Sequence, residues 1–253
     1  MNRLTDLDRL TIRARPPGQP LMHQSWGKLL FMHWRVDERL LPPLIPRHLE
    51  IDTFDGSAWI GFVPFTMWDI RAFPPYVPPV PGLNAMHELN VRTYVHHAGV
   101  PGVWFFSLDC NSAVAVFGAR AFYYLPYYNA TIELEQRDTT IDYISNRTDD
   151  PPAAFRASWQ IGEPLPTSTP DSLAFFLTER YCLFSEHKGE IYRSRIHHNP
   201  WPLRKATLNS YTSTMIESVN LPTPAGEPLL HYAEELSVDI WSLQKESQLS
   251  VVR

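Results

Sequence analysis

The chain has 253 residues, of which 44% are hydrophobic and 13% aromatic, and its formal net charge is −5. A chain of this length can bury a large core, and its modest negative charge excludes a basic surface for nucleic acid or anionic membrane. Because it has no apolar leader and no run near 18 apolar residues, we expect a soluble cytoplasmic protein without a membrane partner.

The first part of the chain divides at a change in pattern near Trp26. Residues 1–20 carry alternating charges and two adjacent prolines, and we expect a loosely ordered arm followed by a single domain over 21–253. The aromatic run at 26–36 predicts a buried strand. Asp37 then favours one short helical turn that the following prolines end.

Turn residues mark the next segments. Residues 50–68 predict a hairpin around the Asp55-Gly56 pair, because glycine readily adopts the positive φ that a two-residue turn requires. The stretch FPPYVPPVPG (73–82) cannot form a helix or a central strand, since five of its residues lack a backbone N–H. We expect a surface loop there, and a stiff flap over a pocket or a polyproline ligand stays open.

The middle of the chain predicts a strand pair followed by a helix. Residues 87–97 alternate, so that Glu88, Asn90 and Arg92 share one face of a strand, which must meet either water or a polar cavity. Residues 102–110 predict the partner strand. The alanine-rich run at 111–123 predicts a helix that begins at Asn111 or Ser112.

The second half repeats the order of strand and helix. Thr169 and Pro170 favour the start of a helix over 169–184. Strands are predicted near 129–137, 139–146, 153–162, 191–198 and within 231–245. About a dozen strands and two longer helices indicate a mainly β protein with a few helices, whose antiparallel sheet curls into a barrel or double sheet.

Seven blocks together resemble one family. They are LLFMHWRV, IDTFDGSAWIGFVPF, ELNVRTYV, GVWFFSLDCNSAVAVFGAR, LPYYNA, FLTERYCLF and HHNPWPL. The blocks lie between residues 29 and 203, and the resemblance as a whole covers about residues 26–243. The combination is similar to the YqjF-like family of bacterial proteins of unknown function, distant relatives of acetoacetate decarboxylase. The resemblance implies a curved antiparallel β-barrel with a central cavity for a small molecule.

The decarboxylase motif is altered in this chain. In enzymes of that fold a Gly-Arg-Glu segment leads into Tyr-Pro-Lys-Lys, whose first lysine forms a Schiff base with a keto acid. The matching residues are Gly118-Ala119-Arg120 and Leu125-Pro126-Tyr127-Tyr128. A phenol cannot form an iminium, and no lysine occurs between residues 29 and 187. Both observations argue against Schiff-base decarboxylation.

The resemblance and the alternating face together supply the candidate site. Glu88 matches a cavity glutamate of the decarboxylase-like family, and Tyr127 beside it would act as a general acid or hydrogen-bond donor. These two are the candidate catalytic residues. Arg120 could bind a substrate carboxylate, stack on Tyr124 or pair with Asp109. The candidate ligand-binding residues are Arg120, Arg92, Tyr123, Tyr128 and His33. Adjacent tyrosines on a strand point to opposite faces, so we expect two of the four tyrosines at 123–128 to line the cavity.

Metal and cofactor chemistry finds no support in the sequence. The ten histidines show no metal-type spacing, although His33 and His198 could meet in space. Cys110 and Cys182 are expected as free buried thiols. We therefore expect no metal and no cofactor, and a small organic acid or carbonyl compound as ligand. A non-catalytic scaffold or sensor with a filled cavity is the alternative, and the sequence leaves a homodimer open.

Overall fold

The structure, a computed structural model, describes residues 4–72 and 85–246, and the predicted proline-rich loop at 73–82 lies outside them. The α-helices are α1 (Asp6–Arg13), α2 (Ala113–Tyr123) and α3 (Leu173–Thr178), and the 3₁₀ turns are η1 (Glu38–Leu40), η2 (Pro42–Leu44) and η3 (Glu217–Val219). None of the described helices is long and apolar enough to span a lipid bilayer.

Strands make up most of the described chain. They are β1 (Met22–Val36), β2 (Glu50–Ile51), β3 (Ala58–Ala72), β4 (Ala85–His97), β5 (Val100–Cys110), β6 (Tyr127–Arg137), β7 (Thr140–Arg147), β8 (Ala154–Pro164), β9 (Cys182–His187), β10 (Glu190–His197), β11 (Leu203–Ser213), β12 (Leu229–Ile240) and β13 (Gln244–Lys245). The expected mainly β architecture with a few helices is confirmed.

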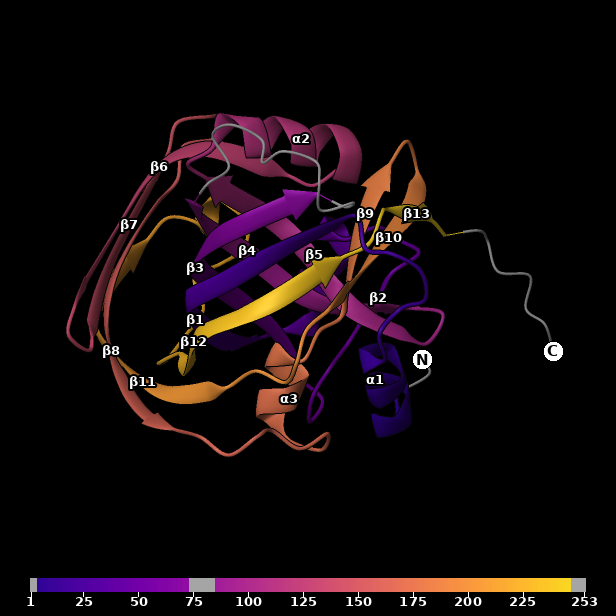
Figure 1. Ribbon diagram of the computed structural model, residues 1–253, viewed down its shortest axis with the longest axis horizontal. Coiled ribbons are helices and arrows are strands. Elements are labelled where there is room, and N and C mark those ends of the chain that lie inside the picture. The colour runs from indigo at the N-terminus through magenta and orange to yellow at the C-terminus, as the bar shows by residue number, and fades with distance from the viewer. Residues whose placement is uncertain (1–3, 73–84, 247–253) are drawn as a thin grey trace.

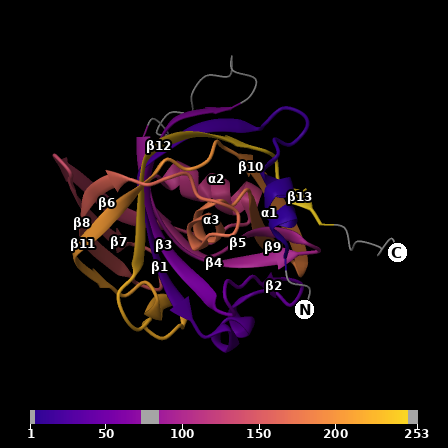
Figure 2. The ribbon, with the colours of Figure 1, turned by 90° about the horizontal axis from the view of Figure 1, so that it is seen from below.

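The strands form one curved sheet that closes on itself in two rings. Their order is β13-β10-β9-β5-β6-β7-β8-β11-β12-β1-β3-β4-β2, with further pairings β10–β12 and β5–β4. One ring therefore runs through β6, β7, β8 and β11, the other runs through β9 and β10, and both share the strands β12, β1, β3, β4 and β5. In Figures 1 and 2 the two rings lie side by side, with α2 and α3 at opposite ends of the β9–β10 ring.

Alternation along the shared strands divides the core between the rings. On β1, Leu30 and Met32 belong to the hydrophobic cluster that packs with β7 and β8, whereas Leu29 and Phe31 belong to the cluster beneath α2. Successive side chains of a strand point to opposite faces, so one strand serves both cores. The β9–β10 ring contains the cavity described below.

The sheet is not antiparallel throughout, which corrects the expectation. β5 pairs in parallel with β6 and with β9. The connection from β5 to β6 contains α2, and a helical crossover returns the chain to the same end of the sheet, as parallel pairing requires. The predicted strand pair, β4 with β5, is antiparallel, and so is the pair β6 with β7.

The N-terminal segment is more ordered than the expected loose arm. Thr5 and Asp8 form a capping box that begins α1. Arg9 is buried and donates two hydrogen bonds to Asp52, each of 2.7 Å. The charges that suggested a solvated arm thus serve as a helix cap and as an ion pair with the domain.

Two further element predictions need correction. The turn at Asp55-Gly56 forms, with φ of 49° and 71°, but the flanking pairing is a single bridge, and Glu50–Ile51 pairs with β4 instead of β3. The helix expected over 169–184 is limited to α3, capped by Ser172, and the residues from Cys182 form β9. An apolar run of this length fits a buried strand as well as a helix, and pairing with β5 and β10 decides for the strand.

Candidate ligand-binding cavity

A cavity of about 470 Å³ lies inside the β9–β10 ring, beneath α2. Most of its wall is apolar and comes from β1, β3, β5 and α2. Its polar lining residues are Gln24, Glu88, Asn90, Arg92, Tyr123, Tyr127, Thr178, Arg180 and His198. A mostly apolar hollow with a few polar groups is typical of a site for a small organic molecule.

The polar face of β4 meets this cavity and not bulk water. Glu88 and Asn90 are buried, and both line the cavity together with Arg92. The intervening Leu89 and Val91 belong to the other core. The alternation seen in the sequence therefore places three polar side chains along one wall of the cavity.

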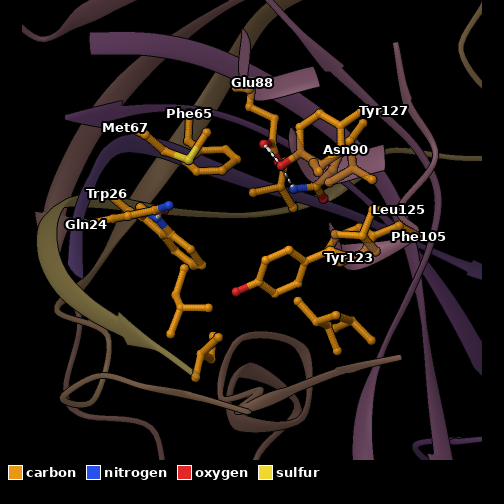
Figure 3. A pocket seen from close by; sticks show the side chains of 18 of the residues that line it. Gln24, Trp26, Phe65, Met67, Glu88, Asn90, Phe105, Tyr123, Leu125 and Tyr127 are labelled. Atoms are coloured by element: carbon orange, nitrogen blue, oxygen red, sulfur yellow. Dashed lines mark hydrogen bonds between the residues drawn. The ribbon is translucent and has the colours of Figure 1, made fainter. Parts of the chain in front are cut away.

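Glu88 and Tyr127 form the central contact of the site. The Tyr127 hydroxyl donates a hydrogen bond of 2.5 Å to Oε2 of Glu88, and Asn90 donates to Oε1 at 3.3 Å (Figure 3). Burial raises the pKa of Glu88 to about 7, against the opposing effect of these two donors. Burial and the neighbouring carboxylate raise the pKa of Tyr127 well above its ordinary value.

Near neutral pH the pair holds a proton on Tyr127 and, in part of the molecules, a second proton on Glu88. Glu88 is present in both protonation states, because its pKa lies close to that pH. Tyr127 stays a phenol and therefore acts only as a donor or neutral acceptor. Such a pair can move a proton to or from a ligand and stabilise a developing oxyanion.

The four tyrosines divide between two surfaces. Strand alternation accounts for Tyr127 and Tyr128 on β6, whereas Tyr123 ends α2 and Tyr124 is its left-handed C-cap. Tyr123 and Tyr127 line the cavity, and Figure 3 shows both rings reaching into it. The Tyr123 hydroxyl donates to the Trp241 carbonyl at 3.3 Å, and burial raises its pKa to about 12. Tyr124 and Tyr128 line a separate open groove on the other side of β6.

Arg120 and Tyr128 lie away from the cavity, which corrects two of the predicted ligand contacts. Arg120 pairs with Asp149 at 2.8 Å and donates to the Tyr127 carbonyl. The Tyr128 ring lies 4.0 Å from the Arg147 guanidinium. Asp109, one expected partner of Arg120, is bound by Arg147 instead. Tyr128 lies on the face of β6 that points away from the cavity, and Arg120 lies on α2, the helix before β6. Both side chains line the groove.

His33 is also not a lining residue. It is fully buried, and its Nε2 lies 2.6 Å from the Tyr94 hydroxyl. Burial and the nearby Arg92 lower its pKa well below the ordinary value, so the ring is neutral. His198 does line the cavity and stacks on Tyr181. Within the described residues, His33 and His198 form no hydrogen bond or ring contact with each other.

Lysine is absent from the cavity wall. All four lysines lie in the part of the chain that the structure describes, and none of them lines the cavity. Cys110 and Cys182 are free and buried, as expected. Within the described ranges, no three side chains of metal-binding type gather into a site.

Arg180 is the main lining residue that the sequence did not indicate. It follows α3 in the segment FLTERYCLF and is buried against the cavity. The sequence predicts a helix throughout that segment, and this prediction does not indicate that the side chain of Arg180 faces a cavity. The signal that could have identified it is a charged residue next to a run of aromatic and aliphatic residues, because such a residue is buried only where it has a polar partner.

Comparison with known proteins identifies the family. The model of the family DUF2071, described as an uncharacterized conserved protein, matches residues 23–237. The chain belongs to this family. The uncharacterized protein YqjF of Bacillus subtilis (strain 168) is 43% identical to this DUF2071 protein over 233 residues, which cover 92% of this chain and 95% of YqjF.

Solved structures with low identity share the fold. The enduracididine biosynthesis enzyme MppR complexed with pyruvate superposes with a TM-score of 0.65 at 14% identity, covering 91% of each chain. Acetoacetate decarboxylase from Legionella pneumophila gives a TM-score of 0.61 at 14% identity, covering 98% of each chain. This DUF2071 protein therefore has an acetoacetate decarboxylase-like fold, as its sequence blocks implied.

Proposed function

We propose that this protein binds a small carbonyl compound in the cavity and transfers a proton at the carbon next to the carbonyl, without a Schiff base. The observation that carries the proposal is the buried contact between Tyr127 and Glu88, in a cavity that no lysine lines. The fold neighbour MppR, which was solved with pyruvate, supports a carbonyl-bearing ligand.

The two residues have separate roles in such a step. The ionised Glu88 takes the proton from the carbon, and the electron pair of the broken C–H bond moves into a new C=C bond. Tyr127 turns its hydroxyl from Glu88 to the carbonyl oxygen and stabilises the enolate that forms. In a β,γ-unsaturated carbonyl compound, return of the proton from Glu88 to the γ-carbon gives isomerisation. In a β-hydroxy carbonyl compound, the electron pair of the enolate expels the hydroxyl group, which takes the proton from Glu88 and leaves as water.

The alternative is a non-catalytic scaffold or sensor whose interior is filled by its own side chains. It has less support, because about 470 Å³ of the interior is left open beside Glu88 and two tyrosine hydroxyls. A protein that only binds the same ligands would nevertheless use the same cavity. Measurement of proton exchange separates the two functions.

Exchange of α-protons in D₂O tests the proposal. Proton NMR should show that the protein accelerates exchange in at least one member of a panel of 2-oxo acids and ketones. Glu88→Gln should lower the exchange rate at least about 100-fold, the usual loss when a general base is removed. Tyr124→Phe, whose ring stacks on His187 in the groove, is the matched control and should keep the rate.

Two results would contradict the proposal. Binding of panel members without any exchange would assign a binding protein. A lysine adduct after borohydride treatment with a keto acid would replace the non-covalent step by a Schiff base.

A further inference from the structure

Arg180 offers an unused hydrogen-bond donor at the cavity wall. Its Nε donates to the Phe176 carbonyl and its Nη1 to Oδ2 of Asp52, each at 2.7 Å. Its Nη2 has no partner among the described residues. The residue is only 5% exposed and lines the cavity. A buried donor without a partner is costly, so a ligand acceptor here would lower the free energy.

Arg92 brings a second guanidinium to the same place. Its Nη2 donates to the Leu177 carbonyl at 3.2 Å and lies 3.4 Å from the Tyr94 hydroxyl, whereas its Nε is buried without a partner in the described structure. The guanidinium carbons of Arg92 and Arg180 lie 5.6 Å and 4.7 Å from the centre of the Tyr94 ring. Both cations therefore border one phenol.

The positive charge of this region exceeds its negative charge. Asp52 is shared by Arg9 and Arg180, each at 2.7 Å. Arg92 forms no ion pair with any carboxylate of the described residues. Among the described residues, Asp52 is thus the one carboxylate that forms an ion pair with these three guanidinium groups, and Arg92 acts on Glu88 only from a greater distance, where it lowers the pKa of that carboxyl group. Burial lowers the pKa of Arg180 to about 10. Buried cations require anionic partners, and the cavity leaves room for one from a ligand.

The distance from this cation pair to Glu88 sets the length of the ligand. Glu88 and Arg92 are four residues apart on β4, about 13 Å between their Cα atoms at about 3.3 Å per residue. Arg92 leans further away, toward Tyr94 and Leu177. A three-carbon acid spans on the order of 3 Å with C–C bonds of about 1.5 Å, and is too short to reach both ends.

The rest of the cavity wall is mostly apolar. Leu29, Phe31, Phe65 and Phe105 contribute to it. We propose that Arg92 and Arg180 form a carboxylate-binding subsite, and that the ligand is an extended monocarboxylate whose apolar body separates the carboxylate from a carbonyl group at Glu88 and Tyr127. The placement of the carbonyl rests on the proposed function, whereas the carboxylate subsite does not.

Calorimetric titration with three matched probes tests the subsite. The probes are 7-oxooctanoate, its neutral methyl ester, and pyruvate, which has the carboxylate without the body. The long acid should bind at least 10-fold more tightly than either of the others. Equal affinity for acid and ester would overturn the cation subsite, and equal affinity for pyruvate would overturn the extended body.

Variants assign the effect to the arginines. Arg92→Gln should weaken binding of 7-oxooctanoate at least 10-fold and leave the ester unchanged, and Arg92→Lys should restore part of the loss. Arg180→Gln should act likewise if circular dichroism shows that it folds. Whether or not Arg180→Gln folds, Arg92→Gln tests the carboxylate subsite, because Arg92 is not part of the Asp52 ion pairs. Arg35→Gln, at an exposed position of β1, is the matched control.

The same probes separate this inference from the proposed function. Binding of the long acid through Arg92 without exchange of its α-protons would leave the subsite standing and exclude the proton transfer. Exchange in neutral ketones that is as fast as exchange in the acid would leave the proton transfer standing and exclude the carboxylate subsite.

Discussion

Glu88 shows how its surroundings change the chemistry of one carboxyl group. It occupies a strand face that sequence alone could equally assign to solvent, and burial in the cavity wall raises its pKa to about 7. The Tyr127 and Asn90 donors keep this shift from being larger. A carboxyl group that is partly ionised near neutral pH can act as acid and as base, which an exposed glutamate cannot do.

This pKa shift predicts a pH-dependent stability. Between about pH 4.5 and pH 7 the folded state binds more protons at Glu88 than the unfolded state does, so the free energy of unfolding falls as the pH rises through this window. At about 1.4 kcal/mol per pKa unit, the free energy of unfolding falls by roughly 3 kcal/mol in total across this window.

Denaturant titrations of the protein and of Glu88→Gln measure the effect. Glutamine keeps an acceptor for Tyr127 and does not titrate, so the stability difference between the two proteins should shift in favour of the variant from pH 5 to pH 8. A difference that does not change with pH would mean that Glu88 has an ordinary pKa.

At the scale of elements, α2 and β3 determine how the cavity is covered and how tightly the sheet packs beside it. Phe117 and Phe122 of α2 are exposed, yet both belong to the cavity lining, so the helix covers the opening loosely. On β3 the packing is close, because a Cβ added at Gly61 would lie 2.8 Å from the His33 ring. Close packing therefore requires glycine at Gly61 of β3 but not at Gly118 of α2.

Alanine substitution should distinguish the two glycines. Gly61→Ala should lower the free energy of unfolding by about 1–3 kcal/mol, since it forces a buried ring to move. Gly118→Ala on α2 meets no atom within 4 Å and should raise it by about 0.5–1 kcal/mol through helix propensity. Thermal unfolding of both variants measures these changes, and equal shifts would contradict the packing described at Gly61.

At the scale of the whole molecule, the closed sheet buries both cysteine side chains. Cys110 and Cys182 lie on different strands of the β9–β10 ring, and both are buried. Burial raises the pKa of Cys110 to about 12 and that of Cys182 further. A buried thiol with a raised pKa is a poor nucleophile.

The thiols should therefore report on global unfolding. A chromogenic disulfide reagent at pH 8 should modify neither thiol in the native protein within minutes and both in guanidinium chloride. Modification of one thiol at a rate independent of denaturant would show that part of the sheet opens locally. The count of two in denaturant is the internal control.

The parts of the fold that sequence predicted are those governed by local patterns. Alternation identified β4 and its polar face, and the Asp55-Gly56 turn and the capping residues of α2 follow from backbone preferences of single residues. The N-terminal helix was missed, and the helix predicted over 169–184 is limited to the short α3. Their limits depend on contacts outside each segment, namely Asp52 for Arg9 and the strands β5 and β10 for the residues from Cys182.

By itself, the sequence determined the chemical inventory of this protein: two tyrosines where a Schiff-base enzyme has lysines, one alternating polar strand, and a composition able to bury a large core. The tertiary structure alone decided which of these groups meet. It moved Arg120, Tyr128 and His33 out of the cavity and brought Arg180 into its wall. The reason is geometric, because closure of the sheet joins side chains far apart in the chain, and no local pattern encodes that distance.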